Sequence, residues 1–415
     1  MSDILTKESI CVVIGASHAG VNLAFSLRKE GWEGSILLFD KDPEIPYHRP
    51  PLSKTYLSNE EVNVLKSAES YQKENINLNL GVLVRSINRT DKTIMLSDGT
   101  NQAYDKLVLA TGARPIIPPI SGIETATHLY PLRTAEDVGH IRNAFHTSKN
   151  KRVVILGGGY IGLETAASIK KLGGTVTVLE RETRILARVT APEMSDFFMN
   201  LHAENGVEVL TDKNVTAING TNGVNMVICT DESQFEADII VIGVGIRVNS
   251  ELANSAGLVI ENGILVDETA CTNDKDIFAI GDCTFHYNPH YNRHVRLESV
   301  QNAVDQAKVA AAAICDKHPV YNTIPWFWSD QYDAKLQMVG LSEGYNETLI
   351  RKEESESTKI SIWYFKDDIL LAVDAINNPK AFVLGTKFIK DGSKIDKSKL
   401  VDVSVPLKPD ELLFL

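Results

Sequence analysis

The stretch that decides the fold is Val153-Val154-Ile155-Leu156-Gly157-Gly158-Gly159-Tyr160-Ile161-Gly162-Leu163-Glu164. Four apolar residues lead into a glycine-rich turn, and the turn opens a helix that Gly173 and Gly174 are placed to end. A second apolar run over residues 175–179 then delivers Glu180. This order of strand, turn, helix and strand predicts the dinucleotide-binding unit of a doubly wound α/β fold.

Three glycines of this turn have separate expected tasks. Gly157 allows the tight turn, Gly159 lets the backbone approach a pyrophosphate, and Gly162 lets the helix pack closely on the strand. The start of the helix also offers free N–H groups and the positive end of its dipole to an anion. The motif alone is also compatible with an ordinary connection between a strand and a helix, but here its structural context is complete.

Glu180 stands at the end of the second strand, close to the spacing of about 20 residues expected for the acid that binds a ribose hydroxyl. A carboxylate at this position repels a 2′-phosphate, so we expect NADH to be preferred over NADPH. Arg181 and Arg184 lie close by in the sequence and leave NADPH open.

A similar unit begins near the N-terminus, where the apolar run 10–14 enters a turn containing Gly15, Ser17 and Gly20. Ser17 replaces the second glycine of the usual pattern, which also allows a plain turn. The next apolar run delivers Asp40, at the spacing of about 20 residues expected of the ribose-binding acid. The paired context favours a second nucleotide site.

Two such units in one chain predict two bound nucleotides. In an open parallel sheet, each nucleotide lies in the crevice beyond the ends of its strands. The natural combination is a tightly held FAD and an exchanging NADH. The predicted fold class is therefore α/β, with two Rossmann-like dinucleotide-binding domains and an α+β C-terminal domain.

Two further segments carry side chains suited to a flavin. The proline-rich stretch 42–54 is stiff and presents Arg49 and Lys54, whose positive charge suits the electron-rich edge of the ring. Solvated charges on a surface loop are the alternative. Asp282 follows a short apolar strand and Gly281, where its carboxylate is placed to accept hydrogen bonds from a polyol chain. Thr272, shortly before this strand, makes the pattern more specific than a bare Gly-Asp turn.

Composition and charge exclude several classes of protein. The chain has 415 residues and a net charge of −12, which argues against binding of nucleic acid. Its five cysteines are widely spaced and form no Cys-x-x-Cys pair, so neither a disulfide framework nor a zinc site is predicted. No apolar run has the roughly 18 residues of a membrane span and no signal peptide is visible, so we expect a cytoplasmic protein without a membrane interaction.

The proline-rich join 116–122 marks the first expected domain boundary. Residues 297–315 read as an alanine-rich helix, and the aromatic cluster 325–332 follows it. Beyond this cluster, two strand-like runs within residues 359–373 predict a mostly antiparallel third domain with a helix or two.

Taken together, these motifs resemble those of the flavin reductases that feed ferredoxins in bacterial oxygenase systems, the putidaredoxin reductase and rubredoxin reductase type. The likeness covers nearly the whole chain. Its specific parts are Arg-Leu-Glu-Ser-Val-Gln-Asn-Ala at residues 296–303 and Pro-Trp-Phe-Trp-Ser-Asp-Gln-Tyr at residues 325–332. The remaining motifs occur throughout the flavoproteins that resemble glutathione reductase.

The resemblance implies a discontinuous FAD-binding domain (1–119 and 246–325), an NADH-binding domain (120–245) and a C-terminal interface domain (326–415). It also implies that Lys54, Glu164 and Trp328 lie nearest the chemistry. The residues implied to contact FAD are Gly15, Ser17, Gly20, Asp40, Arg49, Lys54, Ala113, Arg133, Asp282, Glu298 and Trp328. The residues implied to line the NADH path are Gly157, Gly159, Tyr160, Gly162, Glu180 and Gly245.

The implied activity is that of an NADH-dependent ferredoxin reductase. A hydride passes from NADH to FAD, and single electrons then pass to a [2Fe-2S] ferredoxin or a rubredoxin that supplies an oxygenase such as a P450 or a Rieske dioxygenase. Lys54 and Glu164 are expected to form an electrostatic pair, although a salt bridge with only a structural role is also compatible with the sequence. The protein is expected to be a monomer or a homodimer.

Two rival functions use the same scaffold. A flavin disulfide or peroxide reductase needs a thiolate of low pKa beside the flavin, and the segment 41–54 contains no cysteine. An NADH-responsive signalling flavoprotein, of the apoptosis-inducing-factor type, would be reduced slowly and would change partners rather than feed a ferredoxin.

Overall fold

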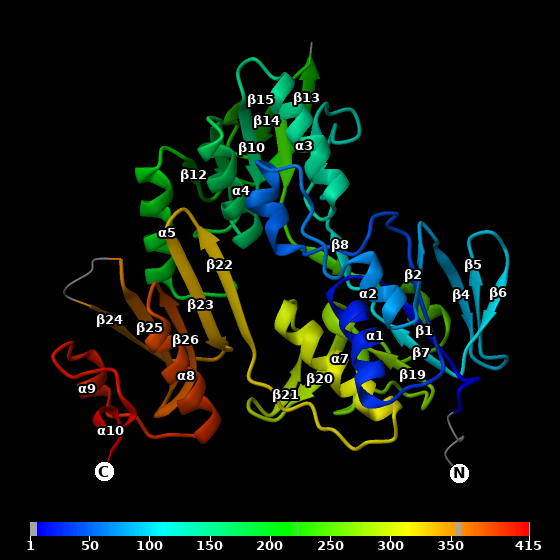
Figure 1. Ribbon diagram of the computed structural model, residues 1–415. Coiled ribbons are helices and arrows are strands. Elements are labelled where there is room, and N and C mark those ends of the chain that lie inside the picture. The colour runs from blue at the N-terminus through cyan, green and yellow to red at the C-terminus, as the bar shows by residue number, and fades with distance from the viewer. Residues whose placement is uncertain (1–5, 222, 354–357, 415) are drawn as a thin grey trace. The chain divides into compact units, whose positions relative to one another are not determined.

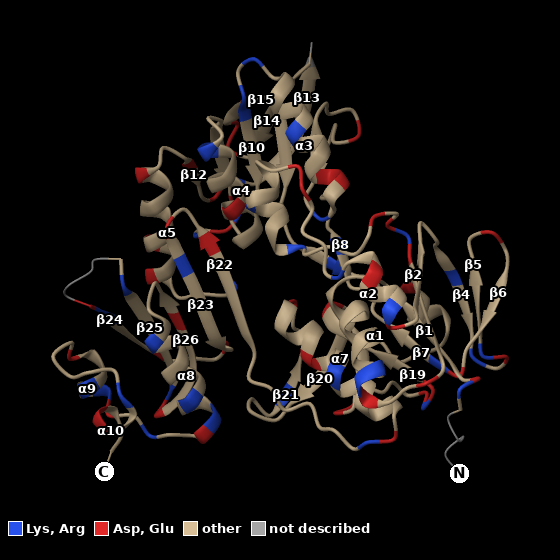
Figure 2. Cartoon of the chain, in the orientation of Figure 1, with Lys and Arg blue, Asp and Glu red and all other residues tan. Residues whose placement is uncertain are grey.

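The computed structural model describes residues 6–221, 223–353 and 358–414 of the chain. The chain folds into two compact units, each built from segments that are far apart in the sequence (Figure 1). Within the described residues, no helix is long and apolar enough to cross a membrane. Acidic and basic residues are interspersed over the helices and loops of both units (Figure 2). The first unit comprises Met1–His48, Val62–Arg114 and Arg247–Pro325, and the second comprises Arg49–Glu61, Pro115–Ile246 and Trp326–Leu415.

A five-stranded parallel sheet forms the centre of the first unit, in the order β19-β7-β1-β2-β3. Side chains alternate between its two faces: Cys11 and Val13 pack into one core with α1 and α7, while Val12 and Ile14 pack into the other. Both faces are therefore buried, which explains the continuous apolar run of β1. The elements are β1 (Ile10–Ile14), α1 (His18–Glu30), β2 (Ser35–Asp40), β3 (Ile76–Leu80), β7 (Lys106–Leu109), β19 (Ile277–Ala279) and α7 (Val300–Ile314).

The predicted strand, turn, helix and strand over residues 10–40 are confirmed, and α1 ends where Gly31 adopts the left-handed φ of 104°. The helix predicted over 297–315 is shorter in the structure. It begins at Val300, because the Ser299 side chain accepts a hydrogen bond from the backbone N–H of Asn302 and so caps the first turn.

Smaller sheets surround the central sheet of the first unit. Strands β4 to β6 form an antiparallel sheet whose apolar side chains join the second core, and β18, β20 and β21 form another sheet. Strands β8 and β17 lie at the points where the chain passes from one unit to the other. The bounds are α2 (Ala68–Lys73), β4 (Val84–Asn88), β5 (Thr93–Leu96), β6 (Asn101–Ala103), β8 (Ala113–Pro115), β17 (Ile246–Val248), α6 (Glu251–Ser255), β18 (Ile264–Val266), η3 (Gly281–Cys283), β20 (Thr284–Asn288) and β21 (Arg293–Val295).

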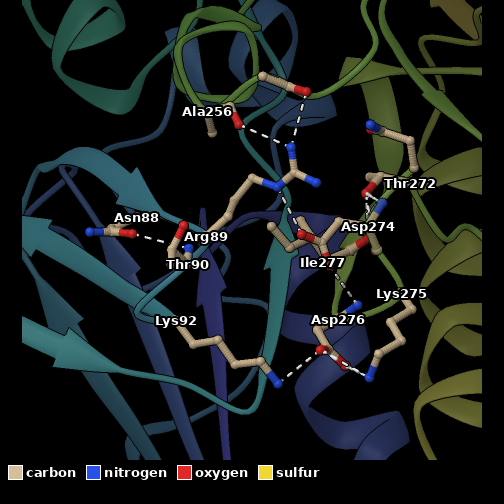
Figure 3. Close-up of polar contacts among 12 residues, drawn as sticks. Asn88, Arg89, Thr90, Lys92, Ala256, Thr272, Asp274, Lys275, Asp276 and Ile277 are labelled. Atoms are coloured by element: carbon tan, nitrogen blue, oxygen red, sulfur yellow. Dashed lines mark hydrogen bonds and ion pairs between the residues drawn. The ribbon is translucent and has the colours of Figure 1, made fainter.

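An ion-pair network fixes the segment that leads into β19 (Figure 3). Arg89 Nε donates to Asp274 Oδ2 at 2.8 Å, and Asp276 pairs with Lys92, Lys106 and Lys275. Burial opposes ionisation of Asp276, but hydrogen bonds from Lys106 and Lys92 outweigh it and lower the pKa of this carboxyl to about 2. These bonds hold the start of β19, and the predicted flavin acid Asp282 follows this strand in η3.

The second unit contains a five-stranded parallel sheet in the order β12-β11-β10-β16-β9. The strand β10 is the apolar run predicted from the sequence, and α4 connects it to β11. A three-stranded antiparallel sheet, β13-β14-β15, shares a core with this sheet. The bounds are β9 (Leu129–Pro131), α3 (Ala135–Thr147), β10 (Arg152–Leu156), α4 (Tyr160–Lys171), β11 (Thr175–Leu179), α5 (Pro192–Glu204), β12 (Glu208–Leu210), β13 (Val215–Thr221), β14 (Val224–Cys229), β15 (Gln234–Ala237) and β16 (Ile239–Ile242).

The C-terminal part of the second unit is an antiparallel sheet in the order β22-β23-β26-β25-β24, as predicted for the third domain. Helix α8 packs on this sheet so closely that a Cβ on Gly385 would lie 2.6 Å from a methyl group of Val373. The bounds are β22 (Trp326–Gln331), β23 (Ala334–Gly340), β24 (Glu347–Lys352), β25 (Ile360–Lys366), β26 (Ile369–Ile376), α8 (Pro379–Asp391), α9 (Lys397–Val401) and α10 (Pro409–Leu412).

The segment Arg49–Glu61 groups with the second unit and carries two short 3-10 helices, η1 (Pro50–Ser53) and η2 (Thr55–Leu57). The resemblance implied that this segment belongs to the FAD-binding domain. The division into three domains at residues 119, 245 and 325 stays a prediction.

Candidate functional site

The first glycine turn, in the first unit, has no room for side chains at its two outer glycines. Gly15 has a φ of +107°, and a Cβ there would lie 2.2 Å from the carbonyl oxygen of Ala110. A Cβ on Gly20 would lie 1.9 Å from the carbonyl oxygen of Gly15. Helix α1 therefore starts directly against the turn, with its N-terminal amides at the carboxyl end of β1.

Asp40, at the end of β2, is held against this turn by two backbone hydrogen bonds. Its Oδ2 accepts from the N–H of Ala16 at 2.6 Å, and its Oδ1 accepts from the N–H of Asp42 at 2.9 Å. Each carboxylate oxygen has a second lone pair, so the side chain keeps acceptor capacity for ribose hydroxyls while anchoring the turn.

Gly281, which precedes the predicted flavin-binding acid Asp282, lies beside the same turn. Its φ is +80°, a Cβ on it would lie 3.0 Å from Cβ of Ala19 in α1, and its N–H donates to Gln306 Oε1 of α7 at 2.7 Å. Partly buried Asp282 follows it in η3, so the acid lies next to the start of α1. Among the other predicted FAD residues of this unit, Ala113 is buried in β8, and Glu298 is exposed and paired with Arg296.

The second glycine turn, in the second unit, repeats this geometry. A Cβ on Gly157 would lie 2.5 Å from the carbonyl oxygen of Gly243, and one on Gly162 would lie 2.1 Å from the carbonyl oxygen of Gly157. At Gly159, a Cβ would meet no atom within 4 Å, so this residue faces open space. Ser17 has the same position before its helix in the first turn, which explains why the fold accepts a side chain there.

Glu180 repeats the role of Asp40. Its Oε2 accepts from the N–H of Gly158 at 2.6 Å, and its Oε1 accepts from the N–H of Glu182 at 2.9 Å. Of the two neighbouring arginines, Arg184 donates to the Ser195 hydroxyl and to the carbonyl of Ala187. Its guanidinium is therefore already hydrogen-bonded within the protein. Arg181 is exposed and pairs with Glu182. This arrangement agrees with a ribose-binding acid, since the ion pair of Arg181 and the hydrogen bonds of Arg184 are made with other groups than the Glu180 carboxylate.

Gly245 lies just after β16 with a φ of +115°, and its carbonyl accepts from the N–H of Ile116. A Cβ built on it would lie 3.8 Å from Arg188 Nη2 and from the terminal methyl of Ile116. The predicted NADH residue therefore needs glycine for its backbone conformation, and Arg188 is a basic neighbour that the sequence did not single out.

Lys54 and Glu164 form the predicted ion pair, with Nζ and Oε2 separated by 2.8 Å. Glu164 lies on α4 and is only 2% exposed. Its Oε2 also accepts from the Ser53 hydroxyl at 2.5 Å, and its Oε1 accepts from the Ser329 hydroxyl at 2.6 Å. Three donors from two other segments therefore surround this one carboxylate.

Arg49 and Arg133, both predicted to contact FAD, also lie together in the second unit. The guanidinium of Arg49 donates to the carbonyl of Arg133 at 2.7 Å. The N–H groups of Arg133 and Thr134 both donate to Asp137 Oδ2, which caps α3. The cap therefore fixes the carbonyl that holds Arg49.

Trp328 belongs to an aromatic cluster on β22. Its ring centre lies 5.6 Å from that of Trp326 and 6.2 Å from that of Phe327. Tyr160, at the start of α4, lies 5.0 Å from Phe327, and its hydroxyl donates to Met338 Sδ at 2.8 Å. Burial, with smaller contributions from nearby carboxylates, raises the pKa of Tyr160 well above its usual value, so its phenol stays neutral.

The five cysteines are free thiols, and burial raises the pKa of every one of them. The pKa reaches about 12 at Cys11 and about 11 at Cys271. A reactive thiolate needs the opposite shift, so none of these thiols has the environment of a redox-active cysteine.

The predicted residues are thus divided between the two units of the structure. Sequence reasoning missed Ser53, Ser329, Asp137 and Gln306, whose side chains hold the predicted ones in place. The available signal for Ser329 was its position next to Trp328, because a strand over this run places the two side chains on opposite faces. The first-unit group is Gly15, Ser17, Gly20, Asp40, Ala113, Asp282 and Glu298; the second-unit group is Arg49, Lys54, Arg133, Gly157, Gly159, Tyr160, Gly162, Glu164, Glu180, Gly245 and Trp328.

Known proteins share this arrangement over nearly the whole chain. Putidaredoxin reductase of Pseudomonas putida is 42% identical over 405 residues, which cover 96% of this chain and 95% of that protein. Rhodocoxin reductase of Rhodococcus erythropolis is 38% identical over 401 residues, with coverage of 96% and 93%. Among solved structures, the covalent putidaredoxin reductase–putidaredoxin complex matches with a TM-score of 0.92 and 41% identity, covering 97% of this chain and 98% of that chain.

Family models agree with these relatives. The pyridine nucleotide-disulphide oxidoreductase model matches residues 10–307, and the reductase C-terminal model matches residues 326–410. The resemblance read from the motifs is confirmed, as is the expected fold class. The chain therefore belongs to the pyridine nucleotide-disulphide oxidoreductase family, in the branch that carries the reductase C-terminal domain.

Proposed function

We propose that this chain is an NADH-dependent ferredoxin reductase that holds FAD and passes electrons to a [2Fe-2S] ferredoxin or a rubredoxin. The observation that carries the proposal is the pair of glycine turns, each with an acid anchored to it by a backbone hydrogen bond of 2.6 Å. Relatives named as reductases of putidaredoxin and rubredoxin support the choice of acceptor.

Both nucleotides suit the residues that are present. A helix starts directly after each glycine turn, and the N–H groups of its first helical turn are a site for a pyrophosphate. Gly15, Ser17, Gly20, Asp40 and Asp282 would hold FAD. Gly157, Gly159, Gly162, Glu180 and Gly245 would hold NADH, with Glu180 binding the ribose hydroxyls and disfavouring a 2′-phosphate.

When bound, FAD supplies the redox chemistry, accepting a hydride from NADH and releasing electrons singly. The protein supplies alignment and charge. Lys54 carries a positive charge whose counterion, Glu164, is fixed by two serines, and Arg49 is fixed by the carbonyl of Arg133. We assign to Lys54 and Arg49 the stabilisation of negative charge at the flavin, and to Trp328 an aromatic contact with it.

The cysteines disfavour a disulfide or peroxide reductase. Such an enzyme needs a thiolate to receive the electrons, whereas here every thiol has a raised pKa. Free thiols throughout also agree with the reducing environment of the cytoplasm, where we place the protein.

The test is anaerobic reduction of the purified yellow protein. NADH should bleach the flavin absorbance in a single turnover, and NADPH should bleach it far more slowly. In steady-state assays with NADH, cytochrome c should be reduced only when a ferredoxin is added. Appearance of new reactive thiols after NADH addition would favour the disulfide reductase instead. Slow reduction with a long-lived charge-transfer band and no ferredoxin-dependent activity would favour the signalling flavoprotein.

A further inference from the structure

We propose that Ser329, Gln331 and His202 are positioning residues that form a buried hydrogen-bond relay, and that this relay holds the carboxylate of Glu164 in place against Lys54. The inference rests on the proposed function, because it assigns to Lys54 a place in flavin reduction. Ser329, Gln331 and His202 were not among the site residues predicted from the sequence.

The relay is continuous through buried side chains of the second unit. His202 Nε2 lies 2.9 Å from Gln331 Oε1, Gln331 Nε2 lies 3.3 Å from Ser329 Oγ, and Ser329 Oγ lies 2.6 Å from Glu164 Oε1. The exposed fraction is 2% for Glu164 and no more than 1% for the other three residues. Water therefore does not compete for these bonds.

All the protons of the relay point the same way. The amide oxygen of Gln331 only accepts, so His202 must donate through its Nε2–H. The amide nitrogen of Gln331 only donates, so the Ser329 oxygen accepts from it. The hydroxyl proton of Ser329 is then directed at Glu164 Oε1. The relay therefore ends on Glu164 Oε1, a carboxylate oxygen that accepts this hydrogen bond.

His202 fits a neutral donor at the outer end. Burial lowers the pKa of its ring, and the hydrogen bond to Gln331 opposes this only in part. Its Nδ1 has no hydrogen-bond partner among the described residues, as expected for an unprotonated ring nitrogen in an apolar place. The ring instead packs edge-on against Tyr332 at 5.3 Å. The tautomer is therefore set as Nε2–H.

Glu164 needs these donors because a buried carboxylate with a single cation is poorly solvated. Lys54 and Ser53 both bind its Oε2. Ser329 is the donor to its Oε1. Loss of the Ser329 hydroxyl would leave a buried carboxylate oxygen without this donor, so the carboxylate would turn towards Ser53 and Lys54. This movement alters where Lys54 is held.

The relay also explains how distant segments converge on one carboxylate. Ser53 ends η1 and Lys54 follows it, while Glu164 comes from α4, Ser329 and Gln331 from β22, and His202 from α5. Tyr160 on the same helix also interacts with Glu164, and its phenol is neutral because burial raises its pKa. The carboxylate of Glu164 is thus held by Lys54 and by neutral hydroxyl donors.

The test compares Ser329→Ala with Ser329→Thr, which keeps a hydroxyl, and with Gln331→Leu, which breaks the relay one step further out. Ser168→Ala is the matched control: Ser168 donates to the carbonyl of Ser53 at 2.9 Å and ties η1 to α4 without touching Glu164. Flavin content and thermal unfolding establish that each variant is folded.

Two readouts separate the relay from the proposed function. The first is the ring ¹⁵N spectrum of His202 in histidine-labelled protein, assigned with His202→Gln. We expect the neutral Nε2–H tautomer in the native chain and loss of its hydrogen-bonded shift in Gln331→Leu. A protonated ring or an Nδ1–H tautomer would overturn the relay, whatever the enzyme does with NADH.

The second readout is single-turnover reduction of bound flavin by NADH across a range of pH. Ser329→Ala and Gln331→Leu should slow it by about 10-fold, with the NADH dissociation constant nearly unchanged, because positioning errors act on the reacting geometry. Ser329→Thr and Ser168→Ala should stay within about 2-fold of the native rate. Equal rates in all variants would overturn the functional role of the relay, whereas a native protein that NADH does not reduce would instead overturn the proposed function.

Discussion

Asp374 is a buried acid whose removal should make the protein more stable at alkaline pH. It lies on β26 between Met338 and Ile362 of the neighbouring strands and is 3% exposed. Its Oδ2 accepts from the hydroxyl of Tyr364 at 2.5 Å. Burial raises the pKa of Asp374 to about 7, although the hydrogen bond from Tyr364 lowers it in part. The substitution Asp374→Asn keeps the shape and an acceptor but cannot ionise.

Proton binding by Asp374 determines whether the free energy of unfolding rises or falls with pH. The pKa of Asp374 is 3.8 unfolded and about 7 folded. Between these values the folded state keeps a proton that the unfolded state has released, so the free energy of unfolding falls as pH rises. The loss is about 1.4 kcal/mol per pH unit and totals about 4 kcal/mol once the pH exceeds the folded pKa. Below the unfolded pKa the penalty is absent, and above the folded pKa it is complete.

The measurement is urea unfolding of the native chain and of Asp374→Asn at several pH values. From about pH 5.5 to about pH 8.5, the native chain should lose about 2 kcal/mol relative to the variant, because only the part of this interval below about pH 7 contributes. Tyr364→Phe removes the bond that lowers the pKa, so its decline should continue to higher pH. A difference between native and Asn chains that stays constant with pH would refute the reasoning.

Three further predictions concern the proposed site. Lys54→Met should slow flavin reduction by NADH by about 100-fold in stopped-flow experiments, as loss of a preorganised charge does, and native traces would remove Lys54 from the reaction. Glu180→Ala should raise KM for NADH by about 10-fold and narrow the preference for NADH over NADPH. The preference is measured as the ratio of the kcat/KM values for the two nucleotides. An unchanged ratio would show that Glu180 does not bind the ribose. Gly162→Ala places a Cβ 2.1 Å from the carbonyl oxygen of Gly157 and should abolish NADH binding in titrations while FAD remains bound; normal NADH affinity would mean that the turn adjusts freely.

Both dinucleotide-binding units were predictable from the sequence because their determinants are local. The turn, the helix start and the acid lie within about 30 residues of one another, and only glycine fits where backbone meets backbone, as at Gly20 and Gly162. The start of α7 at Val300 was less predictable from the sequence. Both Leu297 and the residue after the capping Ser299 were possible first residues of the helix.

The surroundings of Glu164 were not predictable in the same way. Its partners Ser53 and Ser329 are 111 and 165 positions away in the chain, and a serine is too common for its type to indicate a role. The resemblance implied the pair with Lys54 but not the donors that complete it. Only the folded chain brings η1, α4 and β22 to one carboxylate.

The two acids have the same structural role in their units. Asp40 and Glu180 each use one carboxylate oxygen to bind an N–H of the preceding glycine turn and the other to bind an N–H of the loop that follows. Each acid therefore shapes the pyrophosphate site as well as reading the ribose. The distance between turn and acid is fixed by this backbone bond, and not only by the size of the nucleotide. Glu180→Ala removes both functions together, so its raised KM for NADH and its narrowed nucleotide preference should appear in the same variant.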